Sequence, residues 1–204
     1  MDENTIKEFW NYYTALENQL QKTEQYVDHS IDRNSKLING KTFSNEFAKI
    51  LLLAASEFEI VGRKLCSVSG APLEHNSRIV DISKKIIELF PLIGNTVILT
   101  PYYSFRPLGN WKVIRSNGKE KVCGLPWWKG YNEIKHNRSE NIKKANLSNC
   151  INAMAALTVL ELYLSQKALG NLSYISSTAR HYFNFNYGVP ELKWDPTREL
   201  PDFQ

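Results

Sequence analysis

Glycine and proline are scarce in this sequence, with ten glycines and eight prolines among 204 residues. Charged residues of both signs are interspersed along the chain, and hydrophobic residues make up 43% of it, which is enough to form a core. This composition argues against disorder for most of the chain. The length indicates one domain, or one domain followed by an extended tail.

Cysteine is rarer still, since the chain has only Cys66, Cys123 and Cys150. They are far apart in the sequence, no pair has the spacing of metal ligands, and an odd number is a poor basis for disulfide bonds. We interpret them as reduced thiols of a cytoplasmic protein. We expect neither a metal ion nor another cofactor.

Long hydrophobic runs are missing as well. The most apolar stretch, residues 151–164, is too short to span a bilayer and contains Glu161. The acidic N-terminus lacks the positive charge and the apolar run of a signal peptide. We therefore expect no membrane association.

Three common signatures of catalysis are also absent: a glycine-rich phosphate loop, a histidine–cysteine metal motif and a nucleophile elbow. The net charge of +4 permits an anionic partner but is lower than that of most dedicated nucleic-acid-binding proteins. Composition alone therefore leaves the function open.

Apolar residues recur at helical spacing in five segments. These are residues 5–27, 47–68, 78–90, 126–138 and 147–169. We expect Thr42 or Ser44 to cap the second helix, Ser77 the third, and Asn146 or Ser148 the last. The last segment is apolar nearly all round, so we expect it to be buried.

The pattern between the third and fourth helices is extended. Residues 96–103 are rich in β-branched and aromatic side chains, and residues 111–116 and 119–123 flank an Asn-Gly pair, the strongest hairpin signal in the sequence. After residue 172 the chain has aromatic residues and three prolines, which prevent a continuous helix.

The sequence therefore predicts a mainly α fold, a four-to-five-helix bundle over residues 1–172 with a small β excursion at about 96–123. An extended tail over residues 173–204 either folds back over the bundle or meets a protein partner.

The segment 126–138 carries most of the polar chemistry. Pro126 suits the first position of a helix. Helical spacing then places three polar residues on one face: Lys129, Asn132 and His136. It places three more residues on a second face: Tyr131, Lys135 and Arg138. Burying so many polar groups is costly, so at least part of this helix should line a surface or a cleft.

His136 has two interpretations. It is a general acid/base or a phosphate-binding group, because histidine titrates near neutral pH, and Lys129, Lys135 and Arg138 would favour an anionic substrate. Alternatively, it is a surface histidine that hydrogen-bonds a helix end or an interface. The other histidines lie in expected loops and form no cluster in the sequence: His29, His75 and His181.

The neighbouring tryptophans and lysines also have two interpretations. Trp127 and Trp128 form a base-stacking platform, or one enters the core while the other covers a neighbouring loop, which is the commoner arrangement. Lys143 and Lys144 are most simply a solvated face. If the segment binds RNA or a nucleotide, we expect its contacts to include Lys135, Trp128 and Lys143.

Two glutamates interrupt the apolar stripes of the first two helices. Glu17 and Glu57 form a polar network in the core with Tyr26, Arg63 or Lys64, or each of them faces solvent. The sequence barely separates these alternatives.

The stretch Trp127-Trp-Lys-Gly-Tyr-Asn-Glu-Ile-Lys-His-Asn-Arg138, followed by Ala145-Asn-Leu-Ser-Asn-Cys-Ile-Asn-Ala153, resembles uncharacterised bacterial proteins of the HEPN superfamily. The resemblance extends over most of the chain as architecture, but only over these residues as a motif. It implies a HEPN-like helical bundle that forms a homodimer. It also implies metal-independent RNA cleavage across the dimer interface, by attack of the 2′-hydroxyl on the phosphate.

HEPN ribonucleases carry an arginine, often followed by a polar residue, and a histidine four to six residues after the arginine. His136 matches this histidine and Asn132 the polar residue. The resemblance therefore implies His136 as acid/base, with Asn132, Lys129 and Arg138 as orienting or phosphate-binding groups. However, Tyr131 stands where the arginine would be, and Lys129 lacks the planar fork with which arginine holds a phosphate.

Two classes of function follow. The first is an endoribonuclease of a phage-defence or toxin type. The second is a noncatalytic HEPN-like module for binding or dimerisation, within a larger defence or regulatory assembly. The missing arginine favours the second class, whereas the basic helix with its histidine favours the first.

Overall fold

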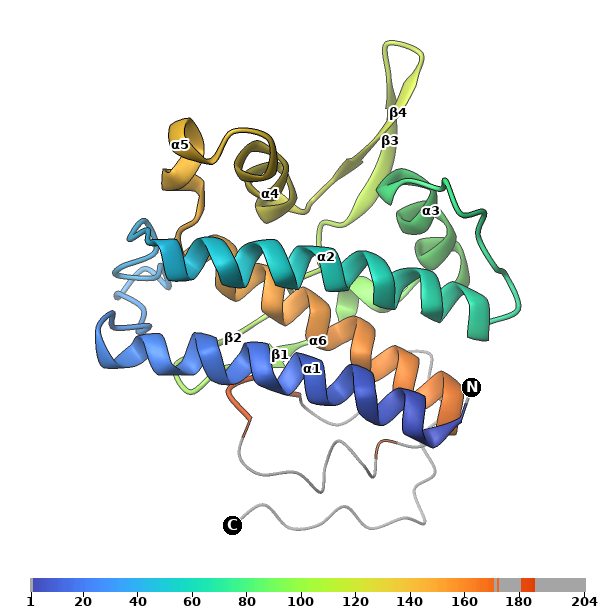
Figure 1. Cartoon of the computed structure of the whole chain (residues 1–204), viewed down its shortest axis with the longest axis horizontal. Coiled ribbons are helices and arrows are strands. Elements are labelled where there is room, and N and C mark those ends of the chain that lie inside the picture. Colours follow the sequence, from blue (N-terminus) through green and yellow to red (C-terminus); the bar gives the residue numbers. More distant parts are fainter. Residues whose placement is uncertain (1, 171, 173–180, 186–204) are drawn as a thin grey trace.

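The computed structural model describes residues 2–170, 172 and 181–185 of the chain (Figure 1). Within them α-helices dominate, as predicted, and the strands form two small sheets. The α-helices are α1 (Glu3–Lys22), α2 (Asn45–Val68), α3 (Ile79–Leu89), α4 (Pro126–His136), α5 (Arg138–Asn141) and α6 (Leu147–Leu169). The short 3-10 helices are η1 (Thr23–Gln25), η2 (Ile93–Asn95) and η3 (Ile142–Lys144). The strands are β1 (Ile98–Leu99), β2 (Ser104–Phe105), β3 (Lys112–Ser116), β4 (Lys119–Cys123) and β5 (Asn184–Phe185).

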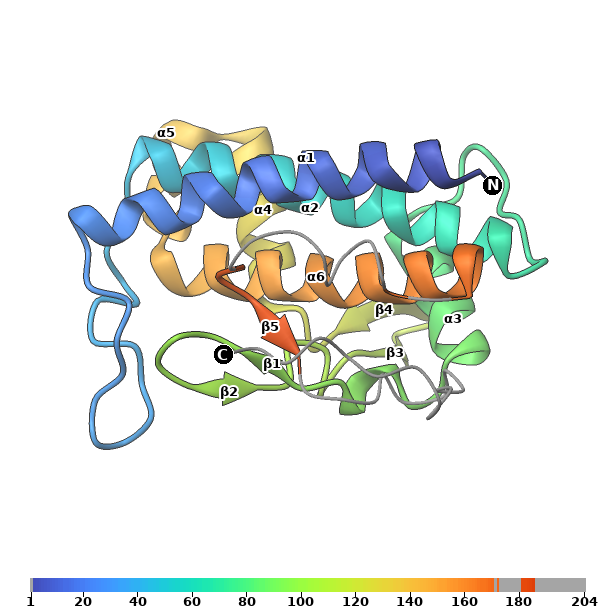
Figure 2. The ribbon, with the colours of Figure 1, turned by 90° about the horizontal axis from the view of Figure 1, so that it is seen from below.

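Helix α6 is the centre of the bundle and packs against both α1 and α2. Figure 2 shows α1 and α2 on one side of α6 and strands β1, β2 and β5 on the other. By length and composition α6 could cross a membrane, but 83% of its most apolar 18-residue window is buried inside the protein. The prediction of a helix buried nearly all round is confirmed, and its apolar surface is that of a core helix.

Polar side chains set where two of the long helices begin. Ser44 accepts a hydrogen bond from the Phe47 N–H at 3.0 Å, ahead of α2. Asn146 accepts one from the Asn149 N–H at 3.0 Å, ahead of α6. Each satisfies an amide that has no partner within its own helix, so both serve as the predicted caps.

The predicted start of the third helix and the predicted end of the first are wrong. The residue before α3 is Arg78 rather than Ser77, and its N–H donates to the Asp81 carboxylate at 2.7 Å. Helix α1 gives way to η1 instead of continuing to residue 27. The Thr23 hydroxyl donates to the Leu20 carbonyl at 2.7 Å, so a side chain takes an acceptor of the last turn and the chain tightens into a 3-10 helix.

Residues 139–146, which separate the predicted helices 126–138 and 147–169, contain most of α5 and all of η3. The chain leaves α4 at Asn137, whose backbone is extended (φ −149°, ψ 83°). The Asn141 side chain then donates to the carbonyls of Glu133 and Asn137, at 3.3 and 2.9 Å. These bonds add to those that the same two carbonyls accept from the N–H groups of Asn137 and Asn141. Helix α4 ends two residues before the predicted end at 138.

The β3–β4 hairpin confirms the strand–turn–strand prediction. The two strands pair antiparallel over their full length. Asn117 and Gly118 between them have positive φ angles of 50° and 74°, as a two-residue type I′ turn requires. Figure 1 shows this hairpin projecting from the bundle.

Strand β5 returns the tail to the bundle, where it pairs antiparallel with β1. Beside it, Tyr182 and Phe183 are buried in the core. Of the two alternatives for the tail, residues 181–185 show the first, in which it folds back over the bundle. The rest of the predicted tail, residues 173–180 and 186–204, lies outside the described residues.

Gly124 connects the hairpin to α4 in a conformation that suits only glycine. Its φ is 83°, and a Cβ at this position would overlap the Asn110 carbonyl oxygen. We expect Gly124→Ala to lower the free energy of unfolding by about 3 kcal/mol, measured by urea denaturation. Gly118 is the matched control, because it also has a positive φ but a Cβ there would meet nothing within 4 Å. Gly118→Ala should cost only about 1 kcal/mol, and equal losses would contradict the steric explanation.

Candidate functional site

Helix α4 is attached to the bundle by its apolar face. Trp127 is fully buried, and the centroid of its ring lies 5.1 Å from that of Phe58 in α2. Gly130 lets α4 approach its neighbours closely, since a Cβ there would lie 2.9 Å from the Asn149 side-chain nitrogen. Trp127 is therefore the core member of the tryptophan pair, whereas Trp128 is half-buried.

The predicted polar face of α4 is present. Lys129 has a side chain that is 79% exposed, and its ammonium lies 3.7 Å from the Glu133 carboxylate. The side-chain amide of Asn132 donates to the Trp128 carbonyl at 3.0 Å. His136 is exposed and forms no hydrogen bond or ion pair with the described part of the chain. These three polar residues follow at spacings of three and four, so they share one side of the helix.

Tyr131 and Lys135 share the next face. The Lys135 ammonium donates to the Tyr131 hydroxyl at 3.3 Å and lies 5.4 Å from the centroid of its ring. Tyr131 is buried and its ring centroid lies 5.0 Å from that of Trp128. Tyr131 is thus a packing residue. We expected Arg138 on this face of the same helix. This prediction is wrong, because α4 ends at His136 and Arg138 begins α5.

Helix η3 brings two more cations to α4. The Lys144 ammonium lies 3.9 Å from the Glu133 carboxylate, which therefore stands between Lys144 and Lys129. Lys143 is exposed. The predicted site residues on α4 are Lys129, Asn132, Lys135, His136 and Trp128, with Lys143 on η3 and Arg138 on α5.

Positive charge is concentrated in residues 112–144, which form the hairpin, α4, α5 and η3. This segment has nine lysines and arginines against three carboxylates, a net charge of +6, whereas the whole chain carries +4. The remainder of the chain is therefore net negative. Figure 1 shows the hairpin, α4 and α5 on the same side of α2. We call the exposed cations of residues 112–144 the basic side.

The charged side chains of the hairpin lie on two opposite faces. The register and the alternation of side chains put Lys112 and Lys121 on one face of the hairpin, and Arg115 and Glu120 on the other. Glu120 pairs with Lys84 of α3 at 2.9 Å. The second face therefore turns toward α3, and Lys112 and Lys121 point away from it.

A buried polar network joins α1 to the tail, and it includes Glu17, as one of the two alternatives from the sequence had it, but with partners that the sequence did not predict. Glu17 accepts hydrogen bonds from the Tyr13 hydroxyl at 2.8 Å and from the Phe183 N–H at 2.9 Å. Its other oxygen lies 2.7 Å from Nδ1 of His181. The Glu17 carboxylate thus holds the returning tail by a backbone and a side-chain contact.

Glu57 is also buried, and its charge affects the pKa of a second buried carboxyl group, that of Glu161 in α6. Burial and the charge of Glu57 raise the pKa of Glu161 well above its ordinary value, and burial raises the pKa of Glu57. Of the two alternatives, the position in the core is correct for both Glu17 and Glu57. In the described part of the chain, however, neither is bonded to the suggested partners Tyr26, Arg63 or Lys64. Tyr26 is exposed, and Arg63 donates to two backbone carbonyls of the loop that follows α2.

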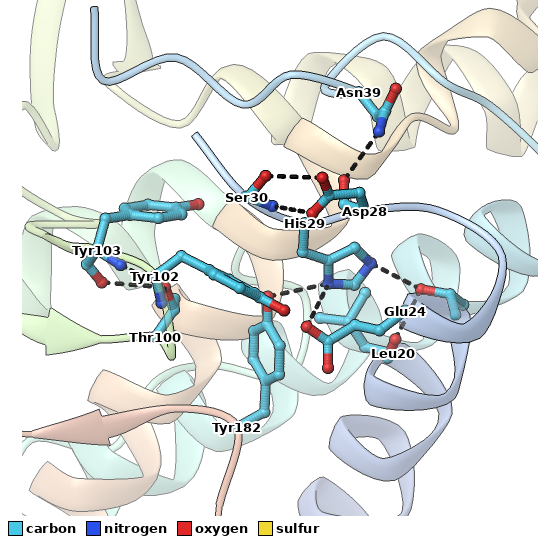
Figure 3. Close-up of polar contacts among 11 residues, drawn as sticks. Leu20, Glu24, Asp28, His29, Ser30, Asn39, Thr100, Tyr102, Tyr103 and Tyr182 are labelled. Carbon is cyan, nitrogen blue, oxygen red and sulfur yellow. Dashed lines mark hydrogen bonds and ion pairs between the residues drawn. The ribbon is translucent and has the colours of Figure 1, made fainter. Parts of the chain in front are cut away.

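His29, expected as an ordinary loop residue, is fully buried (Figure 3). Its Nε2 lies 3.0 Å from the Thr23 hydroxyl and its Nδ1 lies 2.9 Å from the Tyr182 hydroxyl. The Thr23 hydroxyl donates its hydrogen to the Leu20 carbonyl, so the histidine must donate from Nε2, and Nδ1 accepts from Tyr182. Burial lowers the pKa of His29 to about 4, and the neutral ring ties the tail to the chain after α1.

These buried groups are structural, and the accessible chemistry lies on the basic side. Both nitrogens of His29 are occupied. Across residues 2–170, 172 and 181–185, no three side chains of histidine, cysteine, aspartate or glutamate are grouped to hold a metal ion. The described cysteines are free thiols, and burial raises the pKa of Cys66 to about 11, which makes it a poor nucleophile.

Comparisons of the chain with models of protein families, with curated proteins and with solved structures found no match. The resemblance of residues 127–153 to HEPN-like proteins therefore stays a prediction from that motif. The features that bear on function are the concentration of charge on the basic side and the residues that α4 exposes there.

His29 gives the fold a dependence on pH whose sign follows from its buried ring. Its pKa is lower in the folded state than in the unfolded chain, so its contribution is complete above about pH 6.5 and is lost as pH falls toward 4. Between pH 7 and pH 5 we expect the wild type to lose about 2 kcal/mol more unfolding free energy than His29→Gln, by urea denaturation.

His75→Gln, which removes an exposed loop histidine, is the control and should follow the wild type at each pH. A His29→Gln variant whose stability changes with pH as the wild type's does would show that His29 is protonated as readily in the fold as outside it.

Proposed function

We propose that the protein binds RNA through the basic side formed by the hairpin, α4, α5 and η3. The observation that carries the proposal is the concentration of nine cations against three carboxylates in elements that lie together on one side of α2 (Figure 1). Contacts between such cations and phosphates release condensed counterions, which drives binding to a nucleic-acid backbone.

The residues of α4 favour single-stranded RNA. Trp128 is half-buried against Tyr131 and offers part of an aromatic ring on which a base can stack. For the phosphates, exposed Lys129 follows Trp128 on the helix, and exposed Lys143 lies on η3, which packs against α4. His136, exposed on the same helix, supplies a ring nitrogen for a phosphate or a base edge.

Binding is better supported than turnover. At the place of the family arginine, Tyr131 is buried and its hydroxyl accepts from Lys135. The Asn132 amide is bonded to its own helix. Without a guanidinium one turn before His136, the helix lacks the fork that would grip the scissile phosphate. On this proposal the chain is a noncatalytic HEPN-like module.

The resemblance also bears on the oligomeric state, the compartment and the partners of the protein. It supports a homodimer in which residues 126–138 of two copies meet, in the cytoplasm, as part of a larger defence or regulatory assembly. A protein partner for the tail belongs to the same proposal.

Binding is tested by the fluorescence anisotropy of a labelled single-stranded RNA, titrated with wild type and with the double variant Lys129→Gln, Lys143→Gln. We expect the variant to bind about tenfold more weakly at 0.1 M salt, because two phosphate contacts are lost. The slope of log affinity against log salt should fall by about 1.4 for the same reason.

The control variant is Lys22→Gln, Lys167→Gln, which removes two exposed charges from the ends of α1 and α6. It has the same net charge as the test variant, so it should keep wild-type affinity. If both double variants weaken binding equally, the interaction is a response to net charge and the basic side is not the binding surface.

RNA cleavage is the second candidate, because an exposed histidine shares a helix face with Lys129 and Asn132. Total cellular RNA is incubated in EDTA with wild type, His136→Ala, and His75→Ala as an exposed-histidine control. A binding module leaves the RNA intact in all three reactions. Cuts that the wild type and His75→Ala make, and His136→Ala does not, would instead identify a metal-independent nuclease.

A further inference from the structure

A hollow of about 580 Å³ lies where the start of α3 meets the tip of the β3–β4 hairpin. Three cations line it: Arg78, Arg115 and Lys119. In the described part of the chain, none of the three forms an ion pair with a carboxylate. Arg115 and Glu120 line it from the hairpin face that turns toward α3, and Gly118 and Lys119 line it from the hairpin tip. Lys112, Lys121 and the residues of α4 are not part of its lining.

Two carboxylates also line the hollow, and each is engaged elsewhere. Asp81 accepts the Arg78 N–H at 2.7 Å and so completes the start of α3. Glu120 accepts a hydrogen bond from the Lys84 ammonium at 2.9 Å, and Lys84 is not part of the lining. The lining therefore has three cations against two carboxylates that already accept hydrogen bonds elsewhere, and the hollow has positive charge left for an anion.

We propose that this hollow binds a phosphate monoester dianion, such as the 5′-phosphate of a nucleotide. Arg78 and Arg115 present planar groups with several N–H donors, which match the oxygens of a phosphate in pairs. Val80, in the first turn of α3, also lines the hollow, and N–H groups of a first turn have no acceptor within their helix. The volume falls in the range of small-molecule sites.

Isothermal titration calorimetry of the full chain tests the site, with inorganic phosphate and adenosine 5′-monophosphate as probes. We expect both probes to bind the wild type, and adenosine, which has no phosphate, not to bind. Arg78→Gln with Arg115→Gln should weaken the binding of both probes at least tenfold. Unchanged affinity in this double variant would overturn the proposal, as would an absence of binding to the wild type.

The matched control is Lys112→Gln with Lys121→Gln, which removes two charges from the opposite face of the same hairpin. It should bind both phosphates as the wild type does, and an equal loss would show a response to net charge instead of a site. Arg78 and Arg115 are exposed, so their replacement should leave the fold intact. Arg78→Lys with Arg115→Lys keeps the charge without the fork and should bind with an affinity between those of the wild type and the Gln variant.

Two sources of the phosphate are distinguished by RNA oligomers of one sequence that end in a 5′-phosphate or a 5′-hydroxyl. If RNA ends occupy the hollow, the 5′-phosphate raises affinity, and Arg78→Gln with Arg115→Gln abolishes the increment. If a free nucleotide occupies it, the two oligomers bind equally while the mononucleotide still binds. The hollow shares Arg115 and Lys119 with the basic side but not Lys129 or Lys143. Lys129→Gln with Lys143→Gln should therefore weaken RNA binding without changing the affinity for the mononucleotide, so the two proposals can fail separately.

Discussion

The burial of α6 is the constraint on which the rest of the fold depends. Its side chains are apolar nearly all round, so a bundle that covered only one stripe would leave hydrophobic surface in water. Helices α1 and α2 cover one side, and strands β1, β2 and β5 lie on the other (Figure 2). Tyr182 and Phe183 complete this core, and Glu17 and His29 bind the segment that carries them.

The same requirement explains why α4 exposes its polar face. Trp127 packs on Phe58 of α2, and this anchor sets the rotation of the helix about its axis. A short helix with one apolar stripe then has to turn Lys129, Asn132 and His136 outward. Positive charge is concentrated on the outer side of α2 because the hairpin and η3 lie beside α4 there. The cations of these elements take no part in the packing of the core.

Local patterns predicted much of the fold. Apolar periodicity placed the five main helices, Ser44 and Asn146 capped two of them, and the Asn-Gly pair placed the hairpin. The contacts of His29 and His181 were not predictable, because their partners lie about 150 residues away in the sequence and no local period encodes such a pairing. On α4 the spacing of the residues predicted the polar face. It did not predict that Arg138 belongs to α5, because the side chain of Asn141, beyond the helix, bonds to the last turn of α4.

The central claim is that the basic side is the surface that meets RNA, and photochemical cross-linking tests it most directly. Protein and single-stranded RNA are irradiated together, and the cross-linked peptides are identified by mass spectrometry. The account predicts cross-links within residues 112–144, with Trp128 among them, and none in α1 or α6. Cross-links gathered in α1, or an equal spread over the whole chain, would contradict it.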